Sequence, residues 1–327
     1  MSAFKALVCL TTCNRDLLLR RYSPHYLAFC RADRAFDFLV ALDGQDPSSV
    51  SYCLEFGIPL LYSDQREGVG LTKNRVVDRF GAYDYYFFLE DDAELLDARV
   101  FREHIRVAAA AGFHHLSLFE GGGAREILRR DSVCGHSVVF AKYGGAQFSF
   151  FTRQGLEAVG GWHTAFAEPR RGGHTEHSLR FVHAGLADAP FIVIETLTDC
   201  LLWHYPPPVT KRAEAPPGKV LNQLSETEQR LIAQQLTFFP LTTLQPSHFN
   251  GMPLDGSRAF RADDVGLERY PRLSSREKRD AWADFFVALA ATQSGFRRWL
   301  SLLKAACCQP KNTHLRHVLK QAASRAL

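Results

Sequence analysis

Short apolar runs that end in polar loops recur along the first ninety residues of the chain. The runs cover residues 4–10 (FKALVCL), 36–42 (FDFLVAL), 59–62 and 85–89 (YYFFL), each of them about the length of a buried strand. Residues 70–80 (GLTKNRVVDRF) carry apolar side chains at helical spacing and predict a helix. Strands that alternate with helices are typical of a parallel sheet whose ligand-binding loops follow the strands. We therefore expect an α/β fold.

The rest of the chain predicts further elements and a change of character after residue 206. A helix-like stretch after the first strand is expected to be interrupted near Pro24, since proline cannot donate a backbone hydrogen bond. Prolines at 206–208 and 216–217 mark a linker. We therefore expect a catalytic domain over 1–206 and a mainly helical extension over 207–327. The other expected elements are strand pieces within 138–151 that Gly144 and Gly145 separate, a strand at 191–196, and helices at 153–159, 175–185, 224–236, 276–291 and 296–308.

Acidic side chains follow two of the predicted strands. Glu90, Asp91 and Asp92 come directly after YYFFL, and three crowded carboxylates repel one another. A divalent cation relieves this repulsion, and oxygen ligands suit Mg²⁺ or Mn²⁺. The alternative is a solvated turn or the first turn of a helix, where acids favour the dipole. Asp43, followed by Gly44, is either a carboxylate that accepts from a base or ribose hydroxyl, or part of an Asp-Gly turn.

The loop after the first strand is the third of this kind. Residues 11–15 (TTCNR) either bind a nucleotide or cap the helix that follows. Each of the three loops is a weak signal by itself. Because they follow successive strands of a parallel sheet, a nucleotide-binding crevice is the better interpretation.

Taken in order, these motifs resemble those of the GT-A glycosyltransferases, in particular the large family that includes cellulose, chitin and hyaluronan synthases. The resemblance covers residues 4–205. Residues 11–15 stand where the family has a Thr-x-Asn-Arg loop, and 90–92 stand at its DxD motif with Glu90 in place of the first Asp. The remaining matches are Asp43, Gly70-Leu71-Thr72-Lys73-Asn74-Arg75 with Asn and Arg exchanged, Gly160-Gly161-Trp162, and His174-Thr175-Glu176-His177 with Arg180 and Gly185.

The resemblance implies a Rossmann-like nucleotide-diphospho-sugar transferase domain and an inverting single displacement. The donor would be a nucleotide-sugar, with a UDP-sugar favoured, and the acceptor a hydroxyl of a glycan or lipid-linked glycan. Asp92 and His204 would hold Mn²⁺ or Mg²⁺; the alternative for His204 is packing beside Trp203. Trp162 would border the acceptor, or else pack in the core. The implied donor-binding residues are Thr11, Thr12, Asn14, Arg15, Asp43, Lys73, Asn74, Glu90 and Asp91.

The catalytic base is the main departure from the family pattern. His177 stands where the family has its catalytic Asp, which leaves either Glu176 or His177 as the base, with Glu176 preferred as a carboxylate. Three alternatives stay open: an acceptor on protein or modified DNA, a non-catalytic sugar-nucleotide-binding module, and a nucleotidyltransferase. The last would normally have a glycine-rich loop after the first strand, and residues 11–15 contain no glycine.

The charge of the chain is concentrated at its end. The formal net charge is +4, yet residues 293–327 hold seven basic residues and no acid, which leaves −3 for the first 292 residues. Phe296, Trp299, Leu300, Leu303 and Cys307 form an apolar stripe at helical spacing within this tail. The tail predicts an anionic membrane surface as a partner; a helix packed on the catalytic domain and a nucleic-acid partner are the alternatives.

Composition places the chain among globular proteins. It is 46% hydrophobic and 23% charged, and no apolar run approaches the roughly 20 residues that span a bilayer. The N-terminus lacks the pattern of a secretory signal, so we expect a cytoplasmic protein, peripheral on the inner face of the membrane if the tail binds there. The eight cysteines form no CxxC pair, which argues against a zinc knuckle. Without a signal peptide, a disulfide framework is not expected either.

Overall fold

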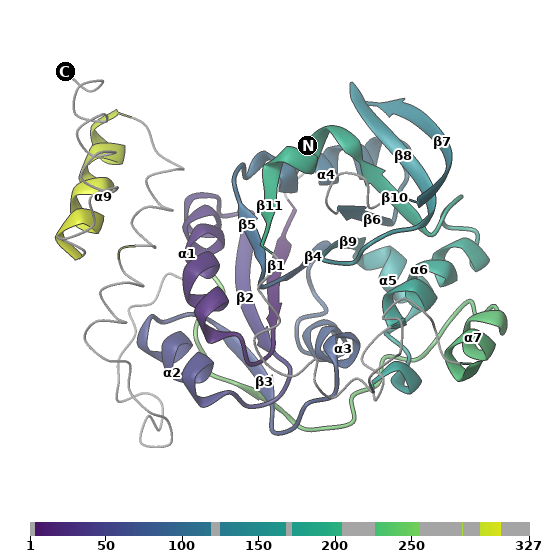
Figure 1. The fold of residues 1–327 in the computed structure, drawn as a ribbon, viewed down its shortest axis with the longest axis horizontal. Coiled ribbons are helices and arrows are strands. Elements are labelled where there is room, and N and C mark those ends of the chain that lie inside the picture. Colours follow the sequence, from purple (N-terminus) through teal and green to yellow (C-terminus); the bar gives the residue numbers. More distant parts are fainter. Residues whose placement is uncertain are drawn as a thin grey trace. The chain divides into compact units, whose positions relative to one another are not determined.

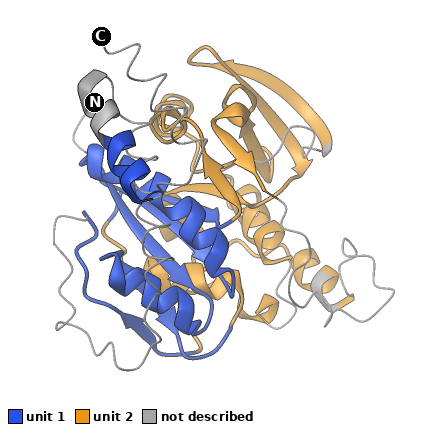
Figure 2. Cartoon of the chain, turned by 60° about the vertical axis from the view of Figure 1, so that its left-hand side comes forward, with its two compact units in different colours: residues 1–66, 83–91, 245–327 blue, residues 67–82, 92–244 orange. Residues whose placement is uncertain are grey.

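The protein is described from a computed structural model, which covers residues 4–118, 125–167, 172–204, 226–255, 283 and 295–308. The chain divides into two compact units (Figure 2). Unit 1 comprises residues 1–66, 83–91 and 245–327, and unit 2 comprises residues 67–82 and 92–244. The predicted proline linker lies outside the described residues, as does the predicted helix 276–291 except for its residue 283.

Unit 1 is built on a largely parallel sheet (Figure 1). Its strands are β1 (Ala6–Thr12), β2 (Phe36–Leu42), β3 (Leu60–Ser63), β4 (Tyr85–Glu90) and β12 (Ser247–Phe249). Their order is β12-β3-β2-β1-β4, and only β12 runs antiparallel to its neighbour. Every residue of β1 and β2 is buried, as the apolar runs predicted. The α/β fold class is therefore confirmed.

Helix α1 (Asp16–Ala32) corrects one expectation from the sequence. The interruption near Pro24 is wrong, because the helix continues through this residue. A proline inside a helix costs about 3 kcal/mol. Burial of Tyr22, Tyr26 and Leu27 offsets this cost, and the Ser23 hydroxyl lies 3.0 Å from the Tyr52 hydroxyl of helix α2 (Pro47–Glu55). Tertiary packing thus overrides the local preference.

Helix α2 was not expected, although its start carries a recognisable signal. The Asp46 carboxylate accepts hydrogen bonds from the backbone amides of Ser48 at 3.2 Å and Ser49 at 3.3 Å, and Pro47 occupies the first helical position. This Asp-Pro-Ser-Ser start is typical of a capped helix N-terminus. The helix leads the chain from the end of β2 back to the start of β3, as a parallel connection requires.

Unit 2 holds a mixed sheet and a separate two-stranded ribbon (Figure 1). The sheet has the order β9-β6-β10-β8-β7, and the ribbon pairs β5 with β11 in antiparallel fashion. Strands β8 and β9 confirm the two pieces that the glycine pair was expected to separate. The strands are β5 (Ala93–Leu95), β6 (His115–Leu118), β7 (Arg125–Val133), β8 (His136–Tyr143), β9 (Phe148–Thr152), β10 (Phe191–Ile194) and β11 (Leu201–Trp203).

The helices of unit 2 agree with the predicted ones at four places. The α-helices are α3 (Val69–Arg79), α4 (Arg99–Ala111), α5 (Arg153–Val159), α6 (Gly173–His183) and α7 (Glu226–Ala233), and the short 3-10 helices are η1 (Thr164–Phe166) and η2 (Glu195–Cys200). Of these α-helices, only α4 was not expected; the two 3-10 helices were not expected either. Its buried face includes Val100, Phe101, Ile105 and Ala108, a spacing that predicts an amphipathic helix.

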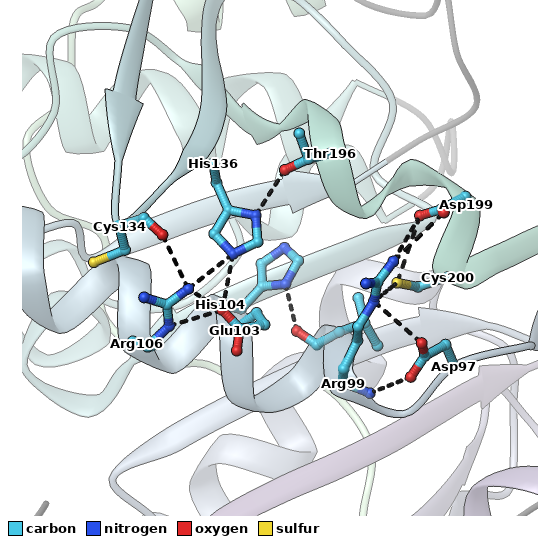
Figure 3. Close-up of polar contacts among 11 residues, drawn as sticks. Asp97, Arg99, Glu103, His104, Arg106, Cys134, His136, Thr196, Asp199 and Cys200 are labelled. Atoms are coloured by element: carbon cyan, nitrogen blue, oxygen red, sulfur yellow. Dashed lines mark hydrogen bonds and ion pairs between the residues drawn. The ribbon is translucent and has the colours of Figure 1, made fainter.

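Polar contacts fasten α4 to the turn between β7 and β8 and to η2 (Figure 3). The His136 ring lies 2.8 Å from a Glu103 carboxylate oxygen through Nε2 and 2.7 Å from the Thr196 hydroxyl through Nδ1. Arg106 contacts the same carboxylate and donates to the Cys134 carbonyl at 3.1 Å. Burial acts to raise the pKa of Glu103, but the hydrogen bonds from Arg106 and His136 outweigh it and lower the pKa. This cluster ties strands to a helix, and its charges are paired with one another.

The described part of the C-terminal tail is helix α9 (Gly295–Cys308), which confirms the helix predicted at 296–308. Its buried face differs from the predicted stripe, because Leu302 and Ala305 are buried whereas Cys307 is exposed and Leu303 half-buried. Within the described ranges, no helix is both long and apolar enough to cross a bilayer. The eight cysteines are in the thiol form.

Candidate functional site

The strand ends of unit 1 gather the polar residues expected at a ligand-binding edge. Strands β2 and β3 lie on one side of β1 and strand β4 on the other, so the order of the strands reverses at β1. Ligands of open α/β sheets bind beyond the carboxyl ends of the strands at such a reversal. Here Thr12 ends β1 and Asp91 follows β4. The Thr12 hydroxyl donates to Asp91, although the two residues are 79 positions apart.

Arg15 completes this strand-end cluster, which we define as Thr12, Arg15, Asp43, Arg66 and Asp91. Its Nη1 donates to Asp91 Oδ1 at 2.8 Å, and the Arg15 side chain is 42% exposed whereas Asp91 is 2% exposed. The buried carboxylate therefore holds a guanidinium whose outer part faces solvent. Such a group binds phosphate oxygens well, since its N–H donors match them in pairs.

The end of β2 joins the same edge. The Asp43 amide donates to the Thr12 carbonyl at 3.0 Å, and Arg66 Nε lies 3.6 Å from Asp43 Oδ2. Gly44 adopts a φ of +92°, and a Cβ on it would lie 2.7 Å from Arg66 Cγ. Glycine is therefore required there, both for the turn and for the close approach of Arg66. The Asp-Gly turn, one of the two alternatives in the sequence, is present, and a ligand-binding role of the Asp43 carboxylate stays a prediction.

Three other predicted donor-binding residues lie near this edge. Thr11 donates from its hydroxyl to the Leu89 carbonyl at 2.9 Å, so this hydroxyl joins β1 to β4. Asn14 adopts a φ of +52°, a left-handed conformation that asparagine tolerates better than most residues. Glu90 is the last residue of β4 and is half-buried.

The β5–β11 ribbon of unit 2 brings together the two predicted metal ligands. Trp203 pairs with Ala93, and the His204 amide donates to the Asp92 carbonyl at 2.8 Å. The His204 ring also lies 2.6 Å from Glu94 through Nε2 and Oε2. Glu94 lies within β5, and Asp92 lies in the turn just before it. Glu94 was missed in the sequence, where the Asp-Ala-Glu alternation was its only signal.

The chemistry of this set suits a divalent cation. Carboxylate oxygens with one imidazole nitrogen are donors that Mn²⁺ accepts, and the imidazole favours Mn²⁺ over Mg²⁺. Among the residues that the structure describes, no three Asp, Glu, His or Cys side chains lie close enough together to hold an ion. The donor types of Asp92, Glu94 and His204 therefore fit, while ion binding would require their side chains to move closer together.

Glu176, at the start of α6, forms a buried ion pair. Its Oε2 accepts from Arg180 Nη2 at 3.0 Å and its Oε1 lies 2.8 Å from Arg180 Nε, with both side chains at most 4% exposed. Arg180 also donates to the Val159 carbonyl at 2.8 Å. Burial raises the pKa of Glu176, and the charge of Arg180 opposes that rise. The carboxylate is thus directed at a permanent cation in the interior.

His177 lies in an aromatic cluster next to this pair. Its ring stacks on Trp162 with 4.1 Å between centroids and 15° between planes. Its Nε2 lies 3.0 Å from the Gly160 carbonyl, which can only accept, so the proton of the neutral ring sits on Nε2. Nδ1 has no hydrogen-bond partner among the described residues. Burial, with the nearby charge of Arg180, holds the pKa of His177 well below its ordinary value.

The helix start at Lys73 and Asn74 is packed against the same cluster. Asn74 donates to the carbonyls of Trp162 at 2.9 Å and Thr242 at 2.8 Å, and accepts from the Trp162 amide at 2.7 Å. Lys73 Nζ lies 5.3 Å from the centre of the Trp162 ring. All three predicted site residues are buried. Trp162 packs on the His177 ring, its role at the acceptor stays a prediction, and Asn74 joins two loops of unit 2.

Comparisons with known proteins find similarity in structure alone. No family model and no curated protein sequence matches the chain. A mannosyltransferase, PcManGT from Pyrobaculum calidifontis, solved with GDP-Man and Mn²⁺, has 11% identity and a TM-score of 0.42; the match covers 100% of this chain and 81% of that one. TarS 1-349 of S. aureus with UDP-GlcNAc has 10% identity and a TM-score of 0.42, with 98% and 92% covered.

A third similar structure is glucosyl-3-phosphoglycerate synthase from Mycobacterium tuberculosis, solved with Mn²⁺, UDP and glucosyl-3-phosphoglycerate. Its identity is 13% and its TM-score 0.42, and the match covers 63% of this chain and 74% of that one. At such identities the similarity concerns the fold, and the ligands named are those of the other proteins.

Proposed function

We propose that this chain is a metal-dependent glycosyltransferase that uses a nucleotide-sugar donor, with a UDP-sugar favoured. The observation that carries the proposal is the strand-end cluster of unit 1, where Arg15 and Asp43 lie at the carboxyl ends of adjacent parallel strands. Arg15 offers N–H donors to a diphosphate, and Asp43 offers an acceptor to a ribose or base donor. Thr11, Thr12 and Asn14 shape the loop that presents them, and Glu90 and Asp91 border it.

The divalent cation belongs with Asp92 and His204, at the ribbon of unit 2. When bound, Mn²⁺ or Mg²⁺ would neutralise the charge that develops on the departing nucleoside diphosphate. Asp91 accepts from both Thr12 and Arg15, so its own contribution is to hold Arg15 in place. In this proposal Lys73 and Asn74 support the fold around Trp162. They influence donor binding only indirectly, through the residues that they position.

The acceptor is a hydroxyl of a glycan or a lipid-linked glycan. Its oxygen attacks the donor's anomeric carbon with inversion and displaces the nucleoside diphosphate. His177 is the better placed of the two candidate bases, because its Nδ1 lone pair is unbonded whereas both Glu176 oxygens lie against Arg180. His177 would take the proton of the acceptor hydroxyl on Nδ1 once the acceptor reaches it. Glu176 then serves to hold Arg180.

A donor screen tests this function. The full chain is incubated with UDP-, GDP-, CMP- and dTDP-sugars and Mn²⁺, and release of the nucleotide is measured together with thermal stability. We expect one nucleotide class to raise the melting temperature and to be released. The Asp92→Ala variant should lose release, while Asp97→Ala, which removes an exposed acid nearby, should retain it. An active Asp92→Ala enzyme would contradict the assignment of the metal site. Binding of a nucleotide-sugar without release of the nucleotide would identify a non-catalytic module.

The nature of the acceptor is tested separately. Transfer is assayed with oligosaccharides, with lipid-linked oligosaccharides, and with protein or modified DNA. The proposal expects product with one of the first two classes. Product only with protein or modified DNA would leave the enzyme class intact and replace the acceptor.

A further inference from the structure

A segment of unit 2 without regular structure lies flat across a pair of glycines. We call residues 236–244 the strap. The Phe239 amide donates to the Val159 carbonyl at 3.0 Å, and the Gly161 amide donates back to the Phe239 carbonyl at 3.0 Å. The side chain of Asn74 donates to the Thr242 carbonyl at 2.8 Å. The strap is thus fixed by its own backbone to the Gly-Gly-Trp motif and to α3.

The two glycines are needed for this close contact. A Cβ on Gly160 would lie 1.8 Å from the Phe239 carbonyl oxygen, and one on Gly161 would lie 2.9 Å from Leu241 Cδ1. The Phe239 ring packs inward, with its centroid 4.0 Å from that of His163. The glycine pair therefore lies directly beneath the strap and leaves room for its close contact.

The strap exposes three large apolar side chains, beside two threonines and a proline. Phe238, Leu241 and Leu244 are 51%, 39% and 57% exposed, and they recur every third residue. Three large apolar side chains on nine residues are costly to leave in water, since burial of each would be favourable. The Phe239 backbone bonds to Val159 and Gly161, and the Thr242 carbonyl accepts from Asn74, so these polar groups are satisfied within the protein. Exposed apolar side chains of this size are favoured where the surrounding medium is itself apolar.

The absence of charge around the strap restricts the kind of partner that its exposed side chains can bind. From residue 231 to residue 246 (LIAQQLTFFPLTTLQP) the chain has sixteen residues and no charged one. Protein interfaces usually surround an apolar centre with a polar, charged rim and draw little energy from leucine. Phenylalanine and leucine without charges are instead typical of side chains that enter the acyl region of a membrane. The strap also differs in this respect from the basic C-terminal tail.

We propose that Phe238, Leu241 and Leu244 insert into the apolar layer of a lipid surface and so bring unit 2 to a membrane. The contact is independent of lipid charge, because the strap carries none. It rests on the exposed side chains and not on the proposed function, although a membrane contact next to the Gly-Gly-Trp motif would suit a lipid-linked acceptor. Basic residues of the tail would add attraction to anionic lipids at low salt.

Sedimentation of the full chain with phosphatidylcholine vesicles in 0.5 M NaCl tests the proposal. High salt screens the tail, so that only an apolar contact remains. We expect the wild-type chain to sediment with the vesicles and a Phe238→Ser, Leu241→Ser, Leu244→Ser variant to bind at least tenfold more weakly. The matched control is Leu128→Ser, which removes a leucine that is 50% exposed on β7 and should leave binding unchanged.

A second readout reports the contact directly. In a Phe238→Trp variant, vesicles with brominated acyl chains should quench the added tryptophan fluorescence, measured against the wild-type chain with the same vesicles. Absence of wild-type binding to phosphatidylcholine, equal binding by the triple variant, or no added quenching would each overturn the proposal. A wild-type dimer that the triple variant abolishes would assign the strap to a second copy of the chain instead. Nucleotide release is measured in parallel, so that failure of lipid binding is distinguished from failure of the proposed enzyme.

Discussion

The ion pair at the strand ends of unit 1 and the ion pair at the start of α6 in unit 2 differ in how exposed they are to solvent. Asp91 is buried, but its partner Arg15 is 42% exposed and can meet a ligand. Glu176 pairs with Arg180, and there both partners are buried. An ion pair with one exposed member keeps charge available for binding. A fully buried pair contributes to stability instead, because breaking it would leave an unpaired ion in the interior.

This contrast separates ligand binding from stability. Substitutions in the strand-end cluster should change nucleotide affinity with little effect on unfolding. Substitutions around α6 should change stability first, and any effect on activity must be corrected for it. The predictions below test this separation, beginning with the largest effect.

Arg180→Ala should destabilise the protein by about 3–5 kcal/mol, because it leaves Glu176 buried without a cation. Urea denaturation followed by circular dichroism measures the change. Arg15→Ala is the matched control: water can replace an arginine that is 42% exposed, and the Thr12 hydroxyl still donates to the Asp91 carboxylate, so the cost should be smaller, about 1–2 kcal/mol. Similar losses in the two variants would remove the distinction between the regions.

Gly160→Ala should cost roughly 2–4 kcal/mol, because the methyl group displaces the strap and the residue must also keep a φ of +76°. Gly185→Ala, at a φ of +71° with open space around it, isolates the backbone contribution and should cost about 1–2 kcal/mol. The comparison is made by denaturant midpoint. A difference of zero between the two variants would mean that the strap is not held against the glycine pair.

Stability should fall as the pH is lowered from 6.5 to 4. Burial lowers the pKa of His115 to about 4, so within this window the unfolded chain binds the proton and the folded chain does not. The contribution is present above pH 6.5 and amounts to roughly 1–3 kcal/mol. Denaturation at several pH values should show a shallower dependence for His115→Phe, which keeps the ring stacked on Phe151. An unchanged slope in that variant would contradict the assignment.

Arg15→Ala should weaken nucleotide binding about tenfold, equivalent to about 1.4 kcal/mol, with only a small change in unfolding. Calorimetric titration with UDP and Mn²⁺ measures the affinity. Arg99→Ala provides the control, because it removes a similarly exposed arginine from α4 (Figure 3). Equal affinities in wild type and Arg15→Ala would place the diphosphate elsewhere.

Local patterns explain why much of unit 1 could be predicted. Strands such as β2 are continuous apolar runs, and the rule that loops follow parallel strands led to Asp43 and Asp91. This rule does not predict which of the charged side chains pair with one another. The pairing of Asp91 with Thr12 and Arg15 joins positions more than 70 residues apart, and only the fold reveals it.

Unit 2 was harder to anticipate because its decisive contacts are tertiary. His177 and Trp162 form motifs that look catalytic, while their burial and mutual stacking depend on α6 packing. The strap forms neither a helix nor a strand, so no pattern in its sequence predicts that it lies on Gly160. The pairing of β5 with β11 is a different case: Asp92 and His204 were both singled out, and the ribbon places them opposite each other. Their roles, and the domain boundary at residue 206, remain predictions.

The most direct test of the account is nucleotide binding at the strand ends of unit 1. Calorimetric titration with UDP and Mn²⁺ is carried out on the wild-type chain, on Asp43→Asn, and on Asp64→Asn, which alters an exposed acid of the same unit. We predict saturable binding by the wild type and by Asp64→Asn, and binding at least tenfold weaker by Asp43→Asn. Absence of binding to any nucleotide, or equal affinity in Asp43→Asn and the wild type, would contradict the account.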